Sequence, residues 1–567
     1  MKIKNILKVT LFSLALSLSL TSCNDWLNLL PDNEQVTEDY WKSKEDVESV
    51  VASGYYYMRQ AVPTLINWGE LRGADFYNLG ASDASKLQDF DMLSSNSLCN
   101  YLSIYQVISM ANSVLKYAPE VQDKDNTYYT SMMQSHLCEA YFQRAWAYTI
   151  LVKNYKEVPL IVDAYVNDNA EMKLPKASES QIIAQIKSDV EAALATGAAK
   201  GTYEEDWQTK SRATKWALYA LMADICLWNH EYDECITYAN KILEATDAIR
   251  PAFITETANW FEIFYPGLSN ESIFELYWDY NTEGINNNFT SIFPALGETV
   301  ISIGSGRGYC NLTEAAKEKM IQETTDVFAY AKSKDIELTP DQRIGRMYLT
   351  SYISNSASWN GSSFTCGNSM SIWKYRGTDI VDATTVRTHT DANFILYRVA
   401  DVMLMKAEAL VMKGQSSWMA AVQIINQIRN RAGLSDFIDS NDVDAINALD
   451  QYTLLTEVFD QREMEFLGEA HRWYDILRLA RYDATFAPEG TVEDNSSLAY
   501  ETYKTAGFGE DVVAYKTKAI ELIASYNQTT SPMQLQSVLQ NSWAWYMPLP
   551  EYDITTNSNL KQNPYYE

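Results

Sequence analysis

The chain lacks most of the short patterns that mark enzyme active sites. Its 567 residues contain only four histidines, with no HExxH pair and no CxxC pair, so a zinc centre is poorly supported. The G-x-S-x-G turn of serine hydrolases is missing, and "GSGRG" at 304–308 lacks the lysine of a phosphate-binding loop. A catalytic pair of carboxylates stays open, because such acids can lie far apart in a chain with 74 acidic residues.

Positive charge and long apolar runs are also scarce. With 45 basic against 74 acidic residues, the formal net charge is −29. Nucleic acid is therefore not expected as a partner, because phosphate backbones are bound through lysine and arginine. After residue 22 no run of 18 apolar residues occurs, so the sequence predicts no membrane-spanning helix.

Residues 1–22 have the three-part pattern of a secretory signal peptide. Three lysines precede the apolar run at 9–20, which is too short to cross a bilayer. The following Leu20-Thr21-Ser22-Cys23 resembles the lipobox of bacterial lipoproteins, in which the cysteine becomes the lipid-bearing first residue. The alternative is an ordinary signal peptide with an incidental cysteine. We expect a lipoprotein signal peptide over 1–22 and a lipid anchor on Cys23.

The six remaining cysteines show no paired spacing. Several lie inside apolar helical patterns, so they are expected to be small buried hydrophobic residues. A chain of this size needs no disulfide framework, although one bridge stays open. The six are Cys99, Cys138, Cys226, Cys235, Cys310 and Cys366.

Helical periodicity dominates the rest of the chain. Residues 213–228 and 232–243 each place apolar residues three and four apart, with a short turn between them, which predicts a helical hairpin. A second hairpin is predicted over 396–432. Both have the small-residue and aromatic pattern of tetratricopeptide hairpins, and stacked hairpins can bury one shared core in a long chain. Further helices are predicted at 45–60, 101–116, 128–153, 179–195 and 453–481.

Two stretches have little clear periodicity. Residues 246–395 are rich in Asn, Ser, Gly, Thr and aromatic residues, and 485–540 are a weaker stretch of the same kind. Long irregular segments in compact proteins are usually functional loops.

The charged stretch "REMEFLGEAHRWYDILRLAR", residues 462–481, has the density of an active site. On one helix, Glu465, Glu469 and Arg472 would lie at steps of four and three, and Asp475 and Arg478 three apart. Carboxylates matched with arginines neutralise each other, whereas a general acid or base needs an imperfectly compensated group. The stretch is therefore interpreted as a strut of ion pairs packed against aromatic residues.

Six segments, in order along the chain, resemble the SusD/RagB family of surface lipoproteins of Bacteroidota. The family's C-terminal pattern R-x-x-E-F-x-x-E-G-x-R-W-x-D-L-x-R matches 462–478, with Ala470 where the pattern tends toward glycine. The other five segments are 139–160, 211–228, 341–345, 397–410 followed by 425–434, and 547–566.

The resemblance implies a mainly α fold, in which about four tetratricopeptide-like hairpins form a superhelical scaffold under a loop-rich ligand region. It implies one domain over 23–567, with an N-terminal part 23–245, a loop-rich region 246–395 and a C-terminal part 396–567. It further implies a lipoprotein on the surface of the outer membrane that captures oligosaccharides, or peptides in the RagB branch. Such proteins deliver the ligand to a SusC-like TonB-dependent transporter and are not enzymes.

A sugar site needs flat aromatic side chains flanked by hydrogen-bonding groups, and loops can present both. Each of these side chains has a scaffold role as its alternative, because loop tryptophans often pack on their own protein. The predicted ligand-binding residues are Trp68, Arg72, Asp75 and Tyr77 in one loop, Trp278, Tyr280, Asn281 and Asn287 in a second, and Trp359 in a third.

Three other functions stay open. A peptide-binding relative would show a cleft lined with backbone-pairing groups. A surface glycoside hydrolase would cleave its glycan, and a tetratricopeptide adaptor would bind only proteins. No cofactor is expected, and a structural calcium ion is left open, since "DSNDVD" at 439–444 lacks the glycine and final glutamate of a calcium loop and is better explained as a helix cap.

Overall fold

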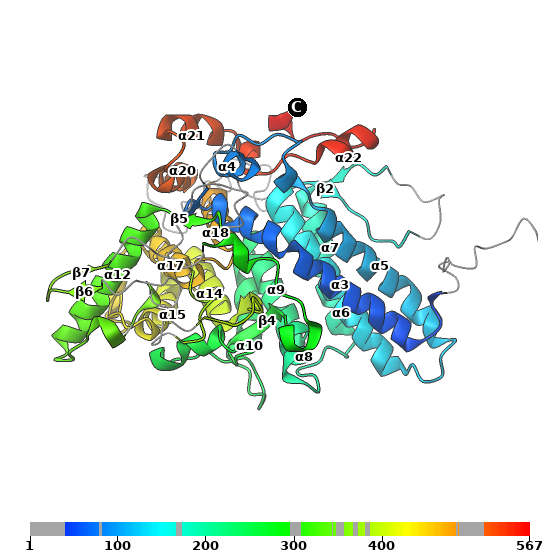
Figure 1. Cartoon of the computed structure of the whole chain (residues 1–567), viewed down its shortest axis with the longest axis horizontal. Helices are drawn as coiled ribbons and strands as arrows, with labels where there is room; N and C mark the ends of the chain where they lie inside the picture. The colour runs from blue at the N-terminus through cyan, green and yellow to red at the C-terminus, as the bar shows by residue number, and fades with distance from the viewer. Residues whose placement is uncertain are drawn as a thin grey trace, which may run out of the picture.

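Long helices packed side by side make up most of the protein in the computed structural model (Figure 1). The structure describes residues 40–78, 82–165, 173–294, 308–342, 344–347, 357–366, 372–379, 386–483, 486 and 515–567. The predicted signal peptide and Cys23 lie outside these residues.

The N-terminal part is a bundle in which each helix packs against the next. Serine capping boxes start two of the helices, with Ser43 before the first and Ser178 before the last. In Figure 1 these helices run alongside one another. The predicted helices at 45–60, 101–116, 128–153 and 179–195 are confirmed as α3 Lys44–Ile66, α5 Leu102–Gln122, α6 Thr130–Tyr155 and α7 Glu179–Ala195.

Both predicted hairpins are confirmed. The first consists of α9 (Lys215–Trp228) and α10 (Tyr232–Leu243), and the second of α14 (Val399–Lys413) and α15 (Trp418–Arg431). Because α10 packs on α14, the two hairpins share one core although about 150 residues separate them in sequence.

The helix predicted at 453–481 is wrong in one respect, because it is broken. The structure has α17 (Gln451–Phe466) and α18 (Arg472–Arg481) with a turn between them. Gly468 and Ala470 in that turn have φ of +81° and +63°, in the left-handed region. The pairs predicted from the spacing of Glu465, Glu469 and Arg472 therefore do not form, whereas Asp475 and Arg478 do pair, at 2.9 Å.

The charged stretch is nevertheless a buried strut, as predicted. The carboxylate of Glu465 lies 2.7 Å from Arg398 and 2.5 Å from Arg431, both on other elements. Arg478 pairs with Glu408 at 2.5 Å. All five side chains are buried, so the stretch joins α14, α15, α17 and α18 through ion pairs.

The middle region contains more regular structure than its sequence predicts. A helix of 20 residues, α12 (Glu314–Ser333), lies within it, capped by Thr313. Strand β4 (Ser272–Leu276) pairs antiparallel with β8 (Phe394–Arg398). Two short helices flank this ribbon, α8 (Asp206–Ser211) and α11 (Tyr280–Glu283).

The second predicted irregular stretch is also partly helical, since α20 (Tyr515–Tyr526) and α21 (Pro532–Leu539) lie within it. Asp442 caps a short helix, as predicted for the run at 439–444. Apart from short 3-10 turns, the remaining short elements of the described residues are the π-helical turn η1 (Asn67–Leu71), α4 Asp83–Gln88, α16 Val443–Asn447, α22 Glu551–Thr556, and the strand pairs β1 Phe76–Tyr77 with β5 Asn311–Leu312, β2 Val158–Pro159 with β3 Lys176–Ala177, and β6 Ser358–Trp359 with β7 Phe364–Thr365.

The C-terminal tail, residues 547–567, lies against the end of α6 and the segment after it. The backbone N–H of Met547 donates to the Asn154 carbonyl at 2.8 Å, and Asn557 Nδ2 donates to the Leu174 carbonyl at 2.8 Å. The buried Asn563 donates to the Met547 carbonyl at 2.7 Å and fixes the tail on itself.

All six cysteines are free thiols, and five are buried, as predicted. Burial raises the pKa of Cys99 to about 12, which keeps its thiol unreactive. Within the described residues, no helix has the length and apolar character needed to cross a membrane.

Candidate ligand-binding site

The first predicted loop is part of the core. Trp68 is fully buried and donates from Nε1 to the Leu98 carbonyl at 2.7 Å. Arg72 is buried over the face of Trp473, with 4.6 Å to the ring centre, and its Nη2 donates to Asn154. Asp75 is buried 3.3 Å from Arg472. The prediction that these three side chains contact ligand is therefore corrected: Trp68 ties η1 to the backbone at Leu98, and Arg72 and Asp75 tie the segment after η1 to α18.

The second loop is partly buried as well. Trp278 is 6% exposed and packs on Phe289 at 5.5 Å, and Asn287 donates to the Ala392 carbonyl at 2.9 Å. The ligand-binding predictions for Trp278 and Asn287 are corrected, because both side chains anchor the loop from beneath.

Four predicted residues stay accessible. Asn281 is exposed, and Tyr77 is half-buried on β1. Tyr280 is half-buried and stacks on His389 with ring centres 3.6 Å apart. Trp359 is half-buried against Phe328 at 5.3 Å, far along the chain from the second loop. Their roles toward ligand stay predictions.

A surface groove of about 230 Å³ lies beside this second loop. Helix α3 forms one wall, α8 the other, and the end of β4 with α11 closes one side. The lining residues are Glu48, Val51, Ala52, Tyr55, Tyr56, Arg59, Trp207, Ser211, Arg212, Leu276, Tyr277 and Glu283.

Aromatic rings dominate the accessible part of the groove. Trp207 on α8 is 41% exposed and Tyr56 on α3 is 48% exposed, which is unusual for such large side chains. The ring of Trp207 stacks on Tyr277 with centres 5.6 Å apart and planes 21° apart. The stack holds the indole in place while leaving much of it accessible, which suits contact with the apolar face of a sugar ring.

Ion pairs fix both walls. Arg59 Nη1 lies 2.7 Å from Glu283 and donates to the Tyr277 carbonyl at 3.0 Å, so it ties α3 to α11. On the other side Arg212 pairs with Glu48 at 2.8 Å and with the buried Glu139 at 2.7 Å. The walls are therefore held by charges that are already matched.

The carboxylate of Glu48 is held in its ionised form. Burial opposes ionisation, but the hydrogen bond from His136 and the charge of Arg212 lower the pKa of Glu48 to about 2. Tyr55 donates to Glu139 at 2.8 Å and accepts from the backbone N–H of Ala213 at 2.9 Å, so the floor of the groove is also tied to the start of α9.

Sequence reasoning missed Trp207 and Tyr56. Trp207 lies in "EEDWQTK", a polar segment without apolar neighbours at helical spacing, and such isolation of a tryptophan signals an exposed ring. The neighbouring Tyr277 begins the stretch "YWDYNTEGINNNF" of the second predicted loop and lines the groove, whereas Trp278 is buried in the core.

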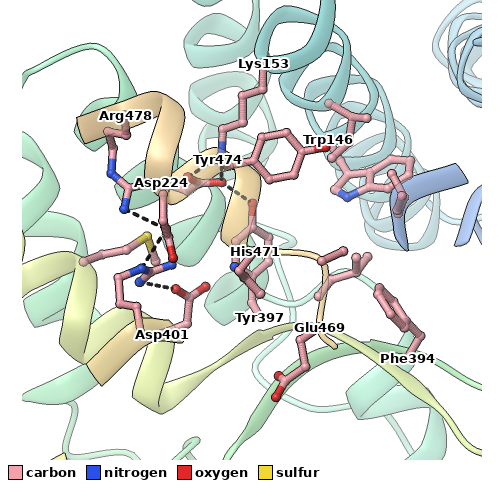
Figure 2. A pocket seen from close by; sticks show the side chains of 17 residues that line it. Trp146, Lys153, Asp224, Phe394, Tyr397, Asp401, Glu469, His471, Tyr474 and Arg478 are labelled. Carbon is pink, nitrogen blue, oxygen red and sulfur yellow. Dashed lines mark hydrogen bonds and ion pairs between the residues drawn. The ribbon is translucent and has the colours of Figure 1, made fainter. Parts of the chain in front are cut away.

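A second hollow lies inside the molecule, between α6, α9, β8, α14 and α18 (Figure 2). Lys153 lies 2.6 Å from Asp224, and Tyr397 donates to the same carboxylate at 2.9 Å. Asp224, which interrupts the apolar stripe of α9 in the sequence, is thus accounted for. The volume of this hollow is about 70 Å³, less than a third of the volume of the groove. It suits a few water molecules and is too small for a sugar ring.

Models of known protein families match most of this chain. The model of the SusD family matches residues 270–566, more than half of the chain. The chain belongs to the SusD family. A second model, described as "Starch-binding associating with outer membrane", matches residues 25–227, so SusD-type models cover both halves of the chain.

Known SusD-like proteins match nearly the whole chain. SusD-like protein P38 of Formosa agariphila is 25% identical over 526 residues, covering 87% of this chain and 95% of that protein. A SusD-like protein of Bacteroides ovatus is 23% identical, covering 97% of this chain and 96% of its own length. Both matches therefore extend over most of this chain and most of the relative.

Solved structures agree on the helical scaffold. A SusD superfamily protein of Bacteroides thetaiotaomicron superposes with a TM-score of 0.65 at 20% identity, covering 93% of this chain and 99% of that one. A laminarin-binding SusD-like protein superposes with a TM-score of 0.59 at 17% identity, covering 92% and 100%. At these identities the likeness establishes the fold, and the ligand has to be argued from the groove.

Proposed function

We propose that this SusD-family protein captures glycans at the outer-membrane surface and delivers them to a SusC-like TonB-dependent transporter. The observation that carries the proposal is the groove in which Trp207, half-exposed and stacked on Tyr277, faces solvent. A fixed, accessible indole supplies the apolar contact that sugar rings need, and the flanking Arg59 and Glu283 supply hydrogen-bonding groups.

Several features support this proposal. One matched family model is described as starch-binding and associated with the outer membrane, and one similar structure is described as laminarin-binding. The lipobox at Cys23 would attach the protein to the membrane. Tyr280 and Asn281 follow Tyr277 within a few residues, so they are candidates for contacts that continue from the groove.

A peptide ligand, as in the RagB branch, is the nearest alternative. Peptides in grooves commonly pair with exposed backbone groups. In this groove the Tyr277 carbonyl already accepts from Arg59, and β4 is paired with β8. The groove instead presents the accessible rings of Trp207 and Tyr56, which favours a glycan.

The test is affinity electrophoresis of the soluble protein, begun after Cys23, through gels that contain plant, host or microbial polysaccharides. We expect retardation by at least one glycan class and its loss in Trp207→Ala, because removing a stacking ring costs about 1–3 kcal/mol, which corresponds to roughly 5- to 150-fold in affinity. Tyr552→Ala, which removes another exposed aromatic ring on α22, is the matched control and should migrate like the parent.

Other outcomes would change the proposal. If no glycan retards the protein, a peptide-binding function or a scaffold that binds only proteins would be favoured instead. The protein would be a hydrolase instead if it releases new reducing ends in proportion to time and loses this activity when one carboxylate pair is mutated.

A further inference from the structure

The cations of the groove are already neutralised. Arg59 pairs with Glu283, and Arg212 pairs with both Glu48 and Glu139, at 2.7–2.8 Å. Among the lining residues that the structure describes, these two arginines are the only cations, and each has at least one carboxylate partner. An anionic ligand would therefore have to compete with a carboxylate that is already in contact.

Neutralised charge does not remove hydrogen-bonding capacity. Arg59 uses Nη1 for Glu283 and the Tyr277 carbonyl, and its Nε and Nη2 groups make no hydrogen bond with a described residue. The side chains of Arg59 and Glu283 are 20% and 32% exposed, so a ligand can reach both. A guanidinium beside a carboxylate offers donors and acceptors together, which suits the hydroxyl groups of a sugar.

The rest of the molecule adds to this selection. A net charge of −29 produces a negative potential that repels a polyanion approaching the groove, most strongly at low ionic strength. A neutral polysaccharide meets no such barrier.

Resting on the proposed function, we infer that the groove selects uncharged glycans and that the Arg59–Glu283 pair is the element that excludes uronate and sulfate groups. Glu283 acts here as a specificity-determining residue, because it occupies the cation that an anionic sugar would otherwise bind.

The test uses three forms of the glycan that retards the protein: unmodified, hydroxyethylated and carboxymethylated. Hydroxyethyl groups control for the size of the substituent without adding charge. Binding is measured by isothermal titration calorimetry at low and high salt, for the parent and for Glu283→Gln. Glu318→Gln on α12 is the matched control, because it removes the same charge from an exposed position outside the groove.

We expect the parent to bind the carboxymethylated form at least tenfold more weakly than the hydroxyethylated form at low salt, with a smaller gap at high salt. Relative to the hydroxyethylated form, the carboxymethylated form should bind Glu283→Gln about fivefold more tightly than it binds the parent. Glu318→Gln should gain much less.

Two results would overturn the inference in distinguishable ways. If the parent binds the charged form as tightly as the hydroxyethylated one, and Trp207→Ala abolishes both, then capture in the groove stands and the selection by charge is wrong. If Trp207→Ala leaves the binding of all three forms unchanged, the groove is not the glycan site and both ideas fall.

Discussion

At the scale of single residues, burial separates the predicted ligand contacts that stay accessible from those that the core encloses. In the sequence, aromatic and hydrogen-bonding residues flank Trp68 and Trp278, as a sugar-binding surface requires, yet both rings are buried in the core. Sequence alone cannot decide this, because one residue of shift in a loop turns a side chain from solvent to core. The platform that the structure offers uses Tyr277, next to Trp278, and Trp207 from a distant helix.

Burial also produces an unusual carboxyl group at Glu70. Burial raises the pKa of Glu70 to about 8, and repulsion from Asp75 adds to the shift. The folded state holds this proton up to about pH 8, whereas the unfolded state releases it near pH 4.5. The contribution of the protonated Glu70 to the free energy of unfolding is therefore fully present below pH 4.5 and is lost as the pH rises toward 8.

Glu70→Gln should therefore remove a pH dependence of about 1.4 kcal/mol per pH unit between pH 5 and pH 8. The amide keeps an acceptor for the Ala470 N–H, which bonds Glu70 in the parent. Urea unfolding at pH 5, 6.5 and 8 measures the effect. A variant whose stability falls with pH as steeply as that of the parent would contradict the assignment.

At the scale of elements, helix content follows from the sequence because apolar periodicity fixes it locally. The helices α3, α5, α6 and α7 are predicted within a few residues, except for a longer C-terminal end of α3 and α5. The α17–α18 break was missed because it depends on left-handed residues whose neighbours favour a helix. The sequence does not reveal α12 because its core-facing stripe, although at helical spacing, is only weakly apolar: three of its six buried residues are Ala316, Thr324 and Ala331.

Two substitutions in the turn between α17 and α18 should have opposite effects on the stability of the protein. Gly468→Ala should destabilise the protein by about 1–2 kcal/mol, because a side chain is disfavoured at φ +81°. Space is not the cause, since an added Cβ would meet Ile372 at an ordinary 3.6 Å. Ala470→Gly, at φ +63°, should relieve strain and have a smaller effect of opposite sign. Thermal unfolding of both variants tests this, and equal signs would contradict it.

The ion pairs that join the C-terminal helices should be costly to break. Glu465→Ala leaves Arg398 and Arg431 short of a carboxylate in a buried site, which should cost about 3–5 kcal/mol. Glu120→Ala removes an exposed partner of Lys116 and should cost less than about 1 kcal/mol. Denaturant unfolding compares the two, and similar losses would show that the buried network contributes little.

At the scale of the whole molecule, family resemblance predicted the scaffold but not the groove. Scaffold segments recur because they pack against one another, whereas the groove is assembled from α3, α8 and α11, whose contacts join residues 164 to 224 positions apart. The resemblance therefore predicts the fold, and only the assembled structure shows the groove.

The predicted lipid anchor is separable from the groove. Cys23→Ser, expressed with its signal peptide, should move the protein from the membrane fraction to the soluble fraction without changing its affinity for glycan, because residue 23 precedes every described lining residue. Fractionation followed by immunoblotting measures the first effect and calorimetry the second. Retention in the membrane fraction would contradict lipidation at Cys23.

The seating of the last residues on α6 has a consequence for the order of events after synthesis. A chain emerges from its N-terminus, so α6 and the segment near Leu174 are exposed long before Met547 and Asn557 arrive to bond with them. Contacts of such sequence separation are slow to close. The contacts between the N-terminal bundle and residues 547–567 therefore form last. In a chain that ends before these residues, the carbonyl groups at the end of α6 lose their donors from the tail and are left to water.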